Sequence, residues 1–434
     1  MDLLVQLGFV ELYQNVSGYL ITFLKWFPVW GPIFFWRYFW HEWMHYVQAR
    51  YKTNMKWVLL EIKIPKEINK TPIAMEIIFN ALHQPSTGTW YDKIWKGKVK
   101  DWFALEMVSF EGNIKFFIRT TGIYKNVIEA QLYAQYPDIE IFEVPDYTRY
   151  VDYRGKDGDW SLIGMDYSLS KPDAYPIKTY VDYGLDKEGA KEEFKTDPLT
   201  SIIEYLGTPG KGEQVWIQII VQAAGSRYHY VDPKTHKHVS GDWKKEGEHL
   251  IDAITKRHEK KDDGSSASRM LNMTKGESEV VAAIERNMSK PGFECAIRAL
   301  YLSKKDKFNP SNIKAIGSLL KPFNTGHLNG FKPIVQTFGL DYWWQDYKDI
   351  RVSHYRQAQF EAYKRREWSF EADTPWIANF PSPKPFVISP YKQPFVLSSE
   401  ELATIFHLPG GVAQTPTFGR ISSRKSEAPT NLPI

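Results

Sequence analysis

The sequence predicts an α+β protein with an N-terminal membrane helix followed by two ferredoxin-like (βαββαβ) units, the second with a helical insertion. Three observations lead to this prediction. A nearly uncharged, aromatic stretch lies close to the amino terminus, and strand and helix patterns from residue 57 onward follow the order β-α-β-β-α-β. A looser copy of that order comes next, and 434 residues suffice for two or three domains.

The composition is that of a folded chain with a substantial core. Hydrophobic residues make up 43% and charged residues 24%, which excludes a disordered chain and a polytopic membrane protein. The net charge of +4 is too small to indicate nucleic-acid binding by itself. A single cysteine, Cys295, excludes an internal disulfide and cysteine-rich metal sites, and its apolar neighbours predict a structural thiol. We expect no cofactor.

Residues 16–46 predict a membrane helix that ends in an aromatic belt. Residues 26–46 contain 11 aromatic residues, and a helix over 16–35 would be about 30 Å long, which matches a bilayer's hydrocarbon core. Because Trp prefers the membrane interface, we expect the interface residues to be Trp26, Trp30, Trp36, Trp40 and Trp43. Two alternatives are an amphipathic helix lying on the bilayer and a buried aromatic core helix.

The flanking charges predict the orientation of that helix. Residues 1–15 form a short acidic segment before it, whereas basic residues follow it from Arg37 to Lys66. The positive-inside rule therefore predicts a single-pass protein of the cytoplasmic membrane, with the lipid bilayer as a partner and the bulk of the chain in the cytoplasm.

His41, Glu42 and His45 match the H-E-x-x-H pattern of zinc peptidases. On a helix, two histidines four residues apart share a face and can both bind Zn²⁺, while the Glu activates a bound water. This pattern makes a membrane zinc metallopeptidase one alternative function. No third ligand follows in a recognisable motif, so we interpret the histidines as interfacial residues beside lipid headgroups and expect no metal.

Residues 55–150 predict the first ferredoxin-like unit. Thr71 and Pro72 are typical of a helix start, Glu111-Gly112 indicates a hairpin turn, and Pro137 ends a helical pattern. The elements expected in this unit are strands over 57–64, 102–110, 113–120 and 138–144, and helices over 71–84 and 124–136.

Residues 170–345 predict a second, looser unit with an insertion near 242–290. The insertion mixes acidic and basic residues, which is more typical of a solvated helix than of a nucleic-acid surface. The expected elements are strands over 177–184, 212–225 and 293–303, helices over 197–206 and 310–323, and an inserted helix over 277–289.

Residues 346–410 predict an extended C-terminal arm with a short helix, and residues 411–434 a disordered tail or linker. Ser398 or Ser399 would cap the helix over 399–406, with acidic residues in its first turn. Its apolar side chains predict a partner-docking element made of Leu402, Ile405, Phe406 and Leu408.

No catalytic motif is present in the sequence. Residues 207–212 resemble a phosphate-binding loop only in composition, and no dinucleotide-binding or nucleophile-elbow pattern occurs. Lys115 and Arg119 beside Phe116 and Phe117 suggest an RNA-binding sheet, but the glycines of that pattern are missing. A membrane-tethered nucleic-acid-binding protein is therefore a further alternative, and direct nucleic-acid contact has little support.

Residues 57–82, 102–120 and 124–144 resemble the amino-terminal region of type IV secretion and conjugative-transfer ATPases. Residues 398–410 and 423–434 resemble the junction at which those chains enter the ATPase core, so the resemblance covers residues 50–434. It implies a membrane-anchored, non-catalytic scaffold or accessory subunit of a translocation apparatus, which self-associates and docks a separately encoded ATPase. It carries over no catalytic residue, because the Walker motifs would follow residue 434.

Overall fold

The computed structural model describes residues 25–65, 70–86, 88–186, 197–225, 228–231, 238–241, 243–255, 273–336, 350–366 and 394–410. The chain divides into two compact units. The smaller unit comprises Met1–Met55, Thr87–Val99 and Thr374–Phe380, and the larger unit comprises the remainder. The predicted segments over 1–15 and 411–434, and the first part of the predicted membrane helix, lie outside the described residues.

The smaller unit is built on helix α3 (Phe27–Asn54) and the short helix α5 (Trp90–Ile94). The Trp43 indole N–H donates to the Ile94 carbonyl at 3.3 Å, and the Trp43 ring packs edge-on against Trp95. Gly97 has a positive φ of 67°, and a Cβ there would lie 2.3 Å from the Val47 carbonyl oxygen. Glycine is therefore required where the chain after α5 passes close to α3.

The prediction of a membrane-spanning helix is wrong for the part of the chain that the structure describes. Helix α3 has 28 residues, but no helix among the described residues is both long and apolar enough to cross a bilayer. The physical reason is that Arg37 and Glu42 interrupt α3 within the predicted segment, and that its Trp and Tyr rings carry polar N–H and O–H groups. The single-pass localisation deduced from that helix is corrected with it.

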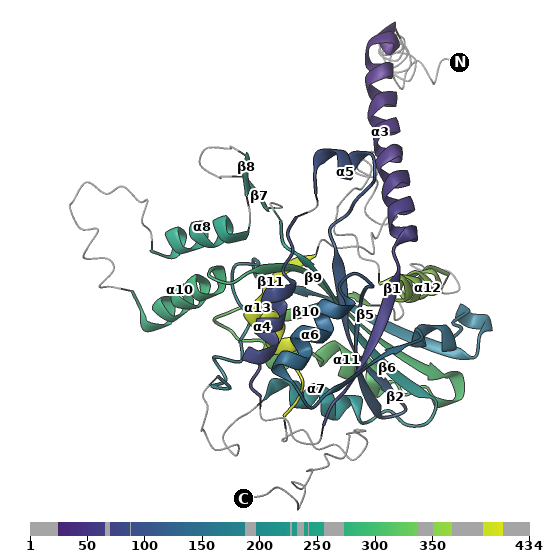
Figure 1. Ribbon diagram of the computed structural model, residues 1–434, viewed down its shortest axis with the longest axis vertical. Coiled ribbons are helices and arrows are strands. Elements are labelled where there is room, and N and C mark those ends of the chain that lie inside the picture. The colour runs from purple at the N-terminus through teal and green to yellow at the C-terminus, as the bar shows by residue number, and fades with distance from the viewer. Residues whose placement is uncertain are drawn as a thin grey trace, which may run out of the picture. The chain divides into compact units, whose positions relative to one another are not determined.

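The larger unit is built on one antiparallel sheet of nine strands, in the order β10-β5-β9-β6-β2-β3-β1-β4, with β11 pairing beside β9 (Figure 1). A separate two-stranded hairpin is formed by β7 (Tyr228–Val231) and β8 (His238–Gly241). The strands of the large sheet are β1 (Trp57–Lys63), β2 (Trp102–Phe110), β3 (Asn113–Thr121), β4 (Glu140–Val144), β5 (Trp160–Leu169), β6 (Glu213–Ala223), β9 (Gly292–Lys304), β10 (Phe331–Gln336) and β11 (Phe395–Ser398).

Helices cover both faces of this sheet. The helices are α4 (Ile73–Leu82), α6 (Lys125–Gln135), α7 (Pro198–Leu206), α8 (Trp243–Thr255), α10 (Lys275–Met288), α11 (Ser311–Ser318), α12 (Ile350–Arg365) and α13 (Ser399–Ile405). The described residues also form the short 3-10 helices η1 (Tyr147–Tyr150), η2 (Gly155–Asp157), η4 (Lys305–Lys307) and η5 (Lys321–Phe323). Figure 1 shows α13, in yellow, beside α4, which it contacts.

Two large apolar clusters form most of the core, one on each face of the sheet, and a small third cluster contains Ala104, Ile220 and Ala296. Strand β2 shows how alternation separates them, since Leu105 and Met107 lie in the larger cluster and Val108 in the smaller. The larger cluster contains residues of α4, α6, α7, α11 and α13, and the smaller one contains residues of η1 and α12. The sheet is therefore buried on both faces.

The prediction of two ferredoxin-like units is wrong, because their strands belong to one sheet. Strands β2 and β6 pair from Trp102↔Gln222 to Phe110↔Gln214 and join the two predicted units directly. Both strands are almost wholly buried, so neither is suited to be a solvent-exposed edge of a sheet. The strand predicted over 177–184 is also wrong, since residues 180–186 form turns and β5 enters the sheet instead.

Candidate functional site

Residues 394–410, called the 394–410 segment from here on, are the last described part of the chain and lie in its interior. Strand β11 pairs with the start of β9, from Phe395↔Cys295 to Ser398↔Gly292, and α13 follows at once. Every residue from 397 to 409 is buried. The predicted short helix and its Ser398 cap are confirmed, since Ser398 and Glu401 form a capping box.

The residues predicted to dock a partner face the chain's own core. Leu402, Ile405, Phe406 and Leu408 are each at most 1% exposed and belong to the large apolar cluster. The Phe406 ring packs edge-on against Phe116 of β3 at 5.9 Å. In this structure the helix therefore docks on its own chain and presents no free apolar face.

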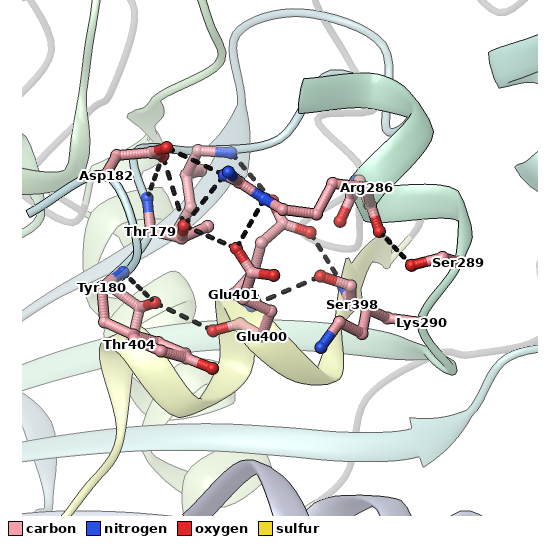
Figure 2. Close-up of polar contacts among 12 residues, drawn as sticks. Thr179, Tyr180, Asp182, Arg286, Ser289, Lys290, Ser398, Glu400, Glu401 and Thr404 are labelled. Carbon is pink, nitrogen blue, oxygen red and sulfur yellow. Dashed lines mark hydrogen bonds and ion pairs between the residues drawn. The ribbon is translucent and has the colours of Figure 1, made fainter. Parts of the chain in front are cut away.

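A polar network surrounds the first turn of α13 (Figure 2). The Glu400 carboxylate accepts the Thr179 hydroxyl at 2.6 Å and pairs with Nε of Arg286 at 3.1 Å. Nη2 of Arg286 in turn pairs with Asp182 at 2.8 Å, and Asp182 accepts the Thr179 amide at 3.0 Å. One arginine of α10 thus ties the loop over 177–186 to the 394–410 segment.

Glu401 is held in a different way from Glu400. Its two carboxylate oxygens accept backbone N–H groups, from Ile177 at 2.9 Å and from Ser398 at 2.8 Å. No cationic side chain forms an ion pair with Glu401 among the described residues. Burial raises the pKa of Glu401 to about 8, even though the two N–H groups favour the charged form.

Ion pairs also fix the segment's surroundings. Lys290, which follows α10, pairs with Glu76 of α4 at 2.6 Å, and Glu76 accepts the Tyr180 hydroxyl. At the other end of the segment, Nε2 of His407 lies 3.0 Å from Asp197, the residue that caps α7. We call the residues that hold the segment the 394–410 site: Glu76, Thr179, Tyr180, Asp182, Asp197, Arg286 and Lys290.

A row of buried polar side chains crosses the opposite face of the sheet. Asp166, Arg298, Gln218 and Glu106 stand directly opposite one another on the adjacent strands β5, β9, β6 and β2. All four are at most 6% exposed. Burying such residues is unfavourable unless they form hydrogen bonds or ion pairs. Their partners therefore identify the element that covers this face of the sheet.

Helix α12 supplies the cover. The Gln359 amide donates to Asp166 at 3.1 Å, and the backbone carbonyl of Tyr363 accepts the Gln218 amide at 3.2 Å. Arg366, directly after α12, pairs with Glu106 at 2.8 Å and also with Asp146. The row therefore positions α12 on the sheet.

Sequence reasoning missed this row, although a signal exists. In each of the four strands a polar residue stands between apolar neighbours near the middle, as in WFALEMVSF around Glu106 and FECAIRALYL around Arg298. An isolated charge in a strand buried on both faces requires a buried partner. The pattern thus indicates a polar row, but not the helix that completes it.

The residues of the alternative zinc motif and the predicted membrane-interface residues lie on or directly before α3. His41, Glu42 and His45 share that helix, and the described residues contain no group of three or more potential metal-binding side chains. Trp26, Trp36 and Trp40 are exposed, and Trp43 packs against α5. Trp30 also lies on α3, at a position where only the backbone is described.

The loop that resembles a phosphate-binding loop is occupied by the protein's own carboxylates. The Gly210 amide donates to Glu213 at 2.8 Å, and the Gly212 amide donates to Glu111 at 2.8 Å. A phosphate-binding loop needs such amides free to face the anion. Residues 207–212 thus connect α7 to β6.

The side chains that suggested an RNA-binding sheet are engaged within the chain. Phe116 and Phe117 are buried on opposite faces of the sheet. Lys115 pairs with Glu61 at 3.0 Å, and the Arg119 guanidinium lies over the Trp57 ring at 4.3 Å. Base stacking needs exposed rings, and these two phenylalanines are not exposed.

Fold and site together define a mixed α/β protein built on one large antiparallel sheet, whose buried polar side chains fix a helix on one face and a chain segment on the other. The sequence matches the family described as Domain of unknown function (DUF8128) over residues 45–419, and the chain belongs to this family. A comparison with curated proteins finds no match.

Proposed function

We propose that this protein is a non-catalytic scaffold or accessory subunit of a translocation apparatus of the type IV secretion or conjugation kind, and that it docks a separately encoded ATPase. One observation carries the non-catalytic part of the proposal. The charged groups that the fold gathers are used to hold its own segments, Glu400 by Arg286 and Glu106 by Arg366.

Catalysis requires a different arrangement of charged groups. A general acid, base or nucleophile must reach a substrate, so its reactive atoms face a cleft. Glu106 and Arg366 are fully buried and bonded to each other, and Glu401 is bonded to backbone amides of its own chain. These contacts support a role in shape and assembly.

The proposed partner rests on the sequence resemblance. Residues 57–82, 102–120 and 124–144 resemble the region that precedes the motor in secretion and conjugation ATPases. A scaffold of this kind would present its outer helices to like subunits and to a motor made as a separate chain.

Co-purification tests the proposal. The tagged full-length chain is isolated from its native host after mild cross-linking, and partners are identified by mass spectrometry. We expect a Walker-motif ATPase in a fixed ratio, reproduced with the two purified proteins by size-exclusion chromatography with light scattering. ATP hydrolysis in the mixture is expected to disappear when the partner's Walker lysine is substituted.

Two results would overturn the proposal. The first is that the folded chain is recovered without any associated ATPase. The second is hydrolysis of ATP or peptides by the purified chain alone, which would place catalysis in this protein. Arg154→Ala removes a side chain that is highly exposed beside Asp152, and this variant is the control for nonspecific loss of binding.

A further inference from the structure

Helix α13 brings two consecutive carboxylates into the protein interior, and only one of them has a cation. Glu400 pairs with Arg286, whereas Glu401, which is 0% exposed, accepts the backbone N–H groups of Ile177 and Ser398 and forms no ion pair among the described residues. An ionised carboxylate that is buried without a cation is unfavourable. The carboxylate is therefore either protonated, or it destabilises the packing around it while it is ionised.

The neighbours of the 394–410 segment do not compensate that charge. Asp173 accepts the Val396 amide of β11 at 3.0 Å, and Glu294 stands opposite Val396 in the strand pairing. The titratable groups around the segment are Glu76 on α4, Tyr180 and Asp182 in the loop before α7, Asp173 with its neighbour Glu246 on α8, Asp197 with His407, Arg286 and Lys290 at α10, and Glu294 and Cys295 on β9. Carboxylates outnumber cations in this set.

Burial acts on several of these carboxyls in the same direction. It raises the pKa of Glu401 to about 8, and burial together with Asp173 raises that of Glu246 to about 7. It also raises the pKa of Glu400, although Arg286 opposes this. For Glu400 and Glu401, which lie on α13 itself, docking therefore favours the protonated carboxyl.

We propose that the 394–410 segment is a pH-sensitive switch, which stays docked on β9 while Glu401 is protonated and undocks as that carboxyl ionises. A group whose pKa is higher in the docked state stabilises docking fully below its undocked value of 4.5, and loses this contribution as the pH rises to about 8. Docking is thus strongest in acid and weakest above pH 8. This inference is independent of the ATPase partner.

The single cysteine reports on undocking. Cys295 is fully buried and stands opposite Phe395 of β11, so its thiol becomes reactive when the segment leaves β9. The native full-length chain is labelled with 4,4′-dithiodipyridine between pH 5.5 and 9. Each rate is divided by the rate in concentrated urea at the same pH, which removes the thiol's own pH dependence and leaves the opening equilibrium.

We expect the normalised rate of the wild type to rise with pH and to level off above about 8. Because other groups titrate as well, the decisive quantity is the ratio of wild type to Glu401→Gln, expected to change about tenfold per pH unit below the plateau. Glu204→Gln, at an exposed position on α7, is expected to match the wild type. If circular dichroism shows that Glu401→Gln is unfolded, Glu401→Met takes its place.

A wild-type rate that is constant over this range would overturn the proposal. So would a Glu401 variant that keeps the full wild-type pH dependence, since the switch would then lie elsewhere. A labelling rate that depends on urea as steeply as global unfolding would also overturn it, because undocking of one short segment exposes less surface than unfolding of the whole protein.

Discussion

Arg366 and Glu106 form an ion pair inside the protein, with Nε of the arginine 2.8 Å from the carboxylate and neither side chain exposed to solvent. Glu106 lies in the middle of β2, and Arg366 directly follows α12, so the pair joins two elements that are 260 residues apart. Arg366 also has a positive φ of 52°, which is uncommon for a residue other than glycine.

Removing the arginine should be strongly destabilising. Arg366→Ala leaves the Glu106 charge buried without a cation, so we expect the free energy of unfolding to fall by about 3–5 kcal/mol. Urea denaturation followed by tryptophan fluorescence measures this. Arg154→Ala removes an arginine whose side chain is 74% exposed, and we expect a change within about 0.5 kcal/mol. Equal effects of the two substitutions would contradict the prediction.

Gly164 of β5 allows α12 to approach the sheet. A Cβ at this position would lie 2.0 Å from Oε1 of Gln359 and 2.7 Å from Cδ2 of Leu300, so Gly164→Ala should cost about 1–3 kcal/mol. Gly276→Ala is the control, because no atom lies within 4 Å of its added Cβ and it is on helix α10. There we expect a gain of up to about 1 kcal/mol. Thermal unfolding distinguishes the two, and a neutral Gly164→Ala would show that the approach is not tight.

The capping box of α13 should contribute more than the similar box of α10. Ser398→Ala leaves the buried Glu401 amide without its acceptor, so we expect a loss of about 1–2 kcal/mol and faster labelling of Cys295. Thr274→Ala removes a solvent-exposed cap and should cost about 1 kcal/mol or less without changing the labelling rate. Faster labelling in both variants would argue against a local effect on the 394–410 segment.

His407 and Asp197 should stabilise the protein most between about pH 4 and pH 6.5. Burial opposes the charge of His407, but Asp197 raises the pKa of its imidazole above the usual 6.5; this stabilisation is complete below 6.5 and is lost as the pH rises through the shifted value. Burial likewise opposes the charge of Asp197, but His407 lowers its pKa, so that contribution is present above 3.8 and is lost as the pH falls through the shifted value.

Unfolding of His407→Gln at different pH values tests this window. The difference in unfolding free energy from the wild type should be larger at pH 5.5 than at pH 8.5. A histidine titration by NMR should give a pKa for His407 above the usual 6.5. A His407 pKa below 6.5 would show that burial outweighs the ion pair.

Local sequence patterns determined most individual elements. The hairpin turn at Glu111-Gly112 is confirmed, because both residues have positive φ and Phe110 pairs with Asn113. The helix starts at Asp197 and Ser398 follow from side chains that accept backbone N–H groups within one turn. Such interactions lie within a few residues of each other, so a single sequence is enough to indicate them.

Assembly of those elements was decided only by the tertiary structure. Alternation of apolar and polar residues shows which face of a strand is apolar. The pairing of β2 with β6, however, is made by backbone hydrogen bonds along the strand edges, and the side-chain sequence does not specify which edges pair. The same holds for the partners of buried charges. Glu106 and Glu401 are buried carboxylates that each require a partner. Their partners, Arg366 for Glu106 and the amide of Ile177 for Glu401, come from distant parts of the chain. These groups come within bonding distance only when the chain folds. A buried polar group needs a hydrogen-bond or ion-pair partner, but that partner can come from any part of the sequence.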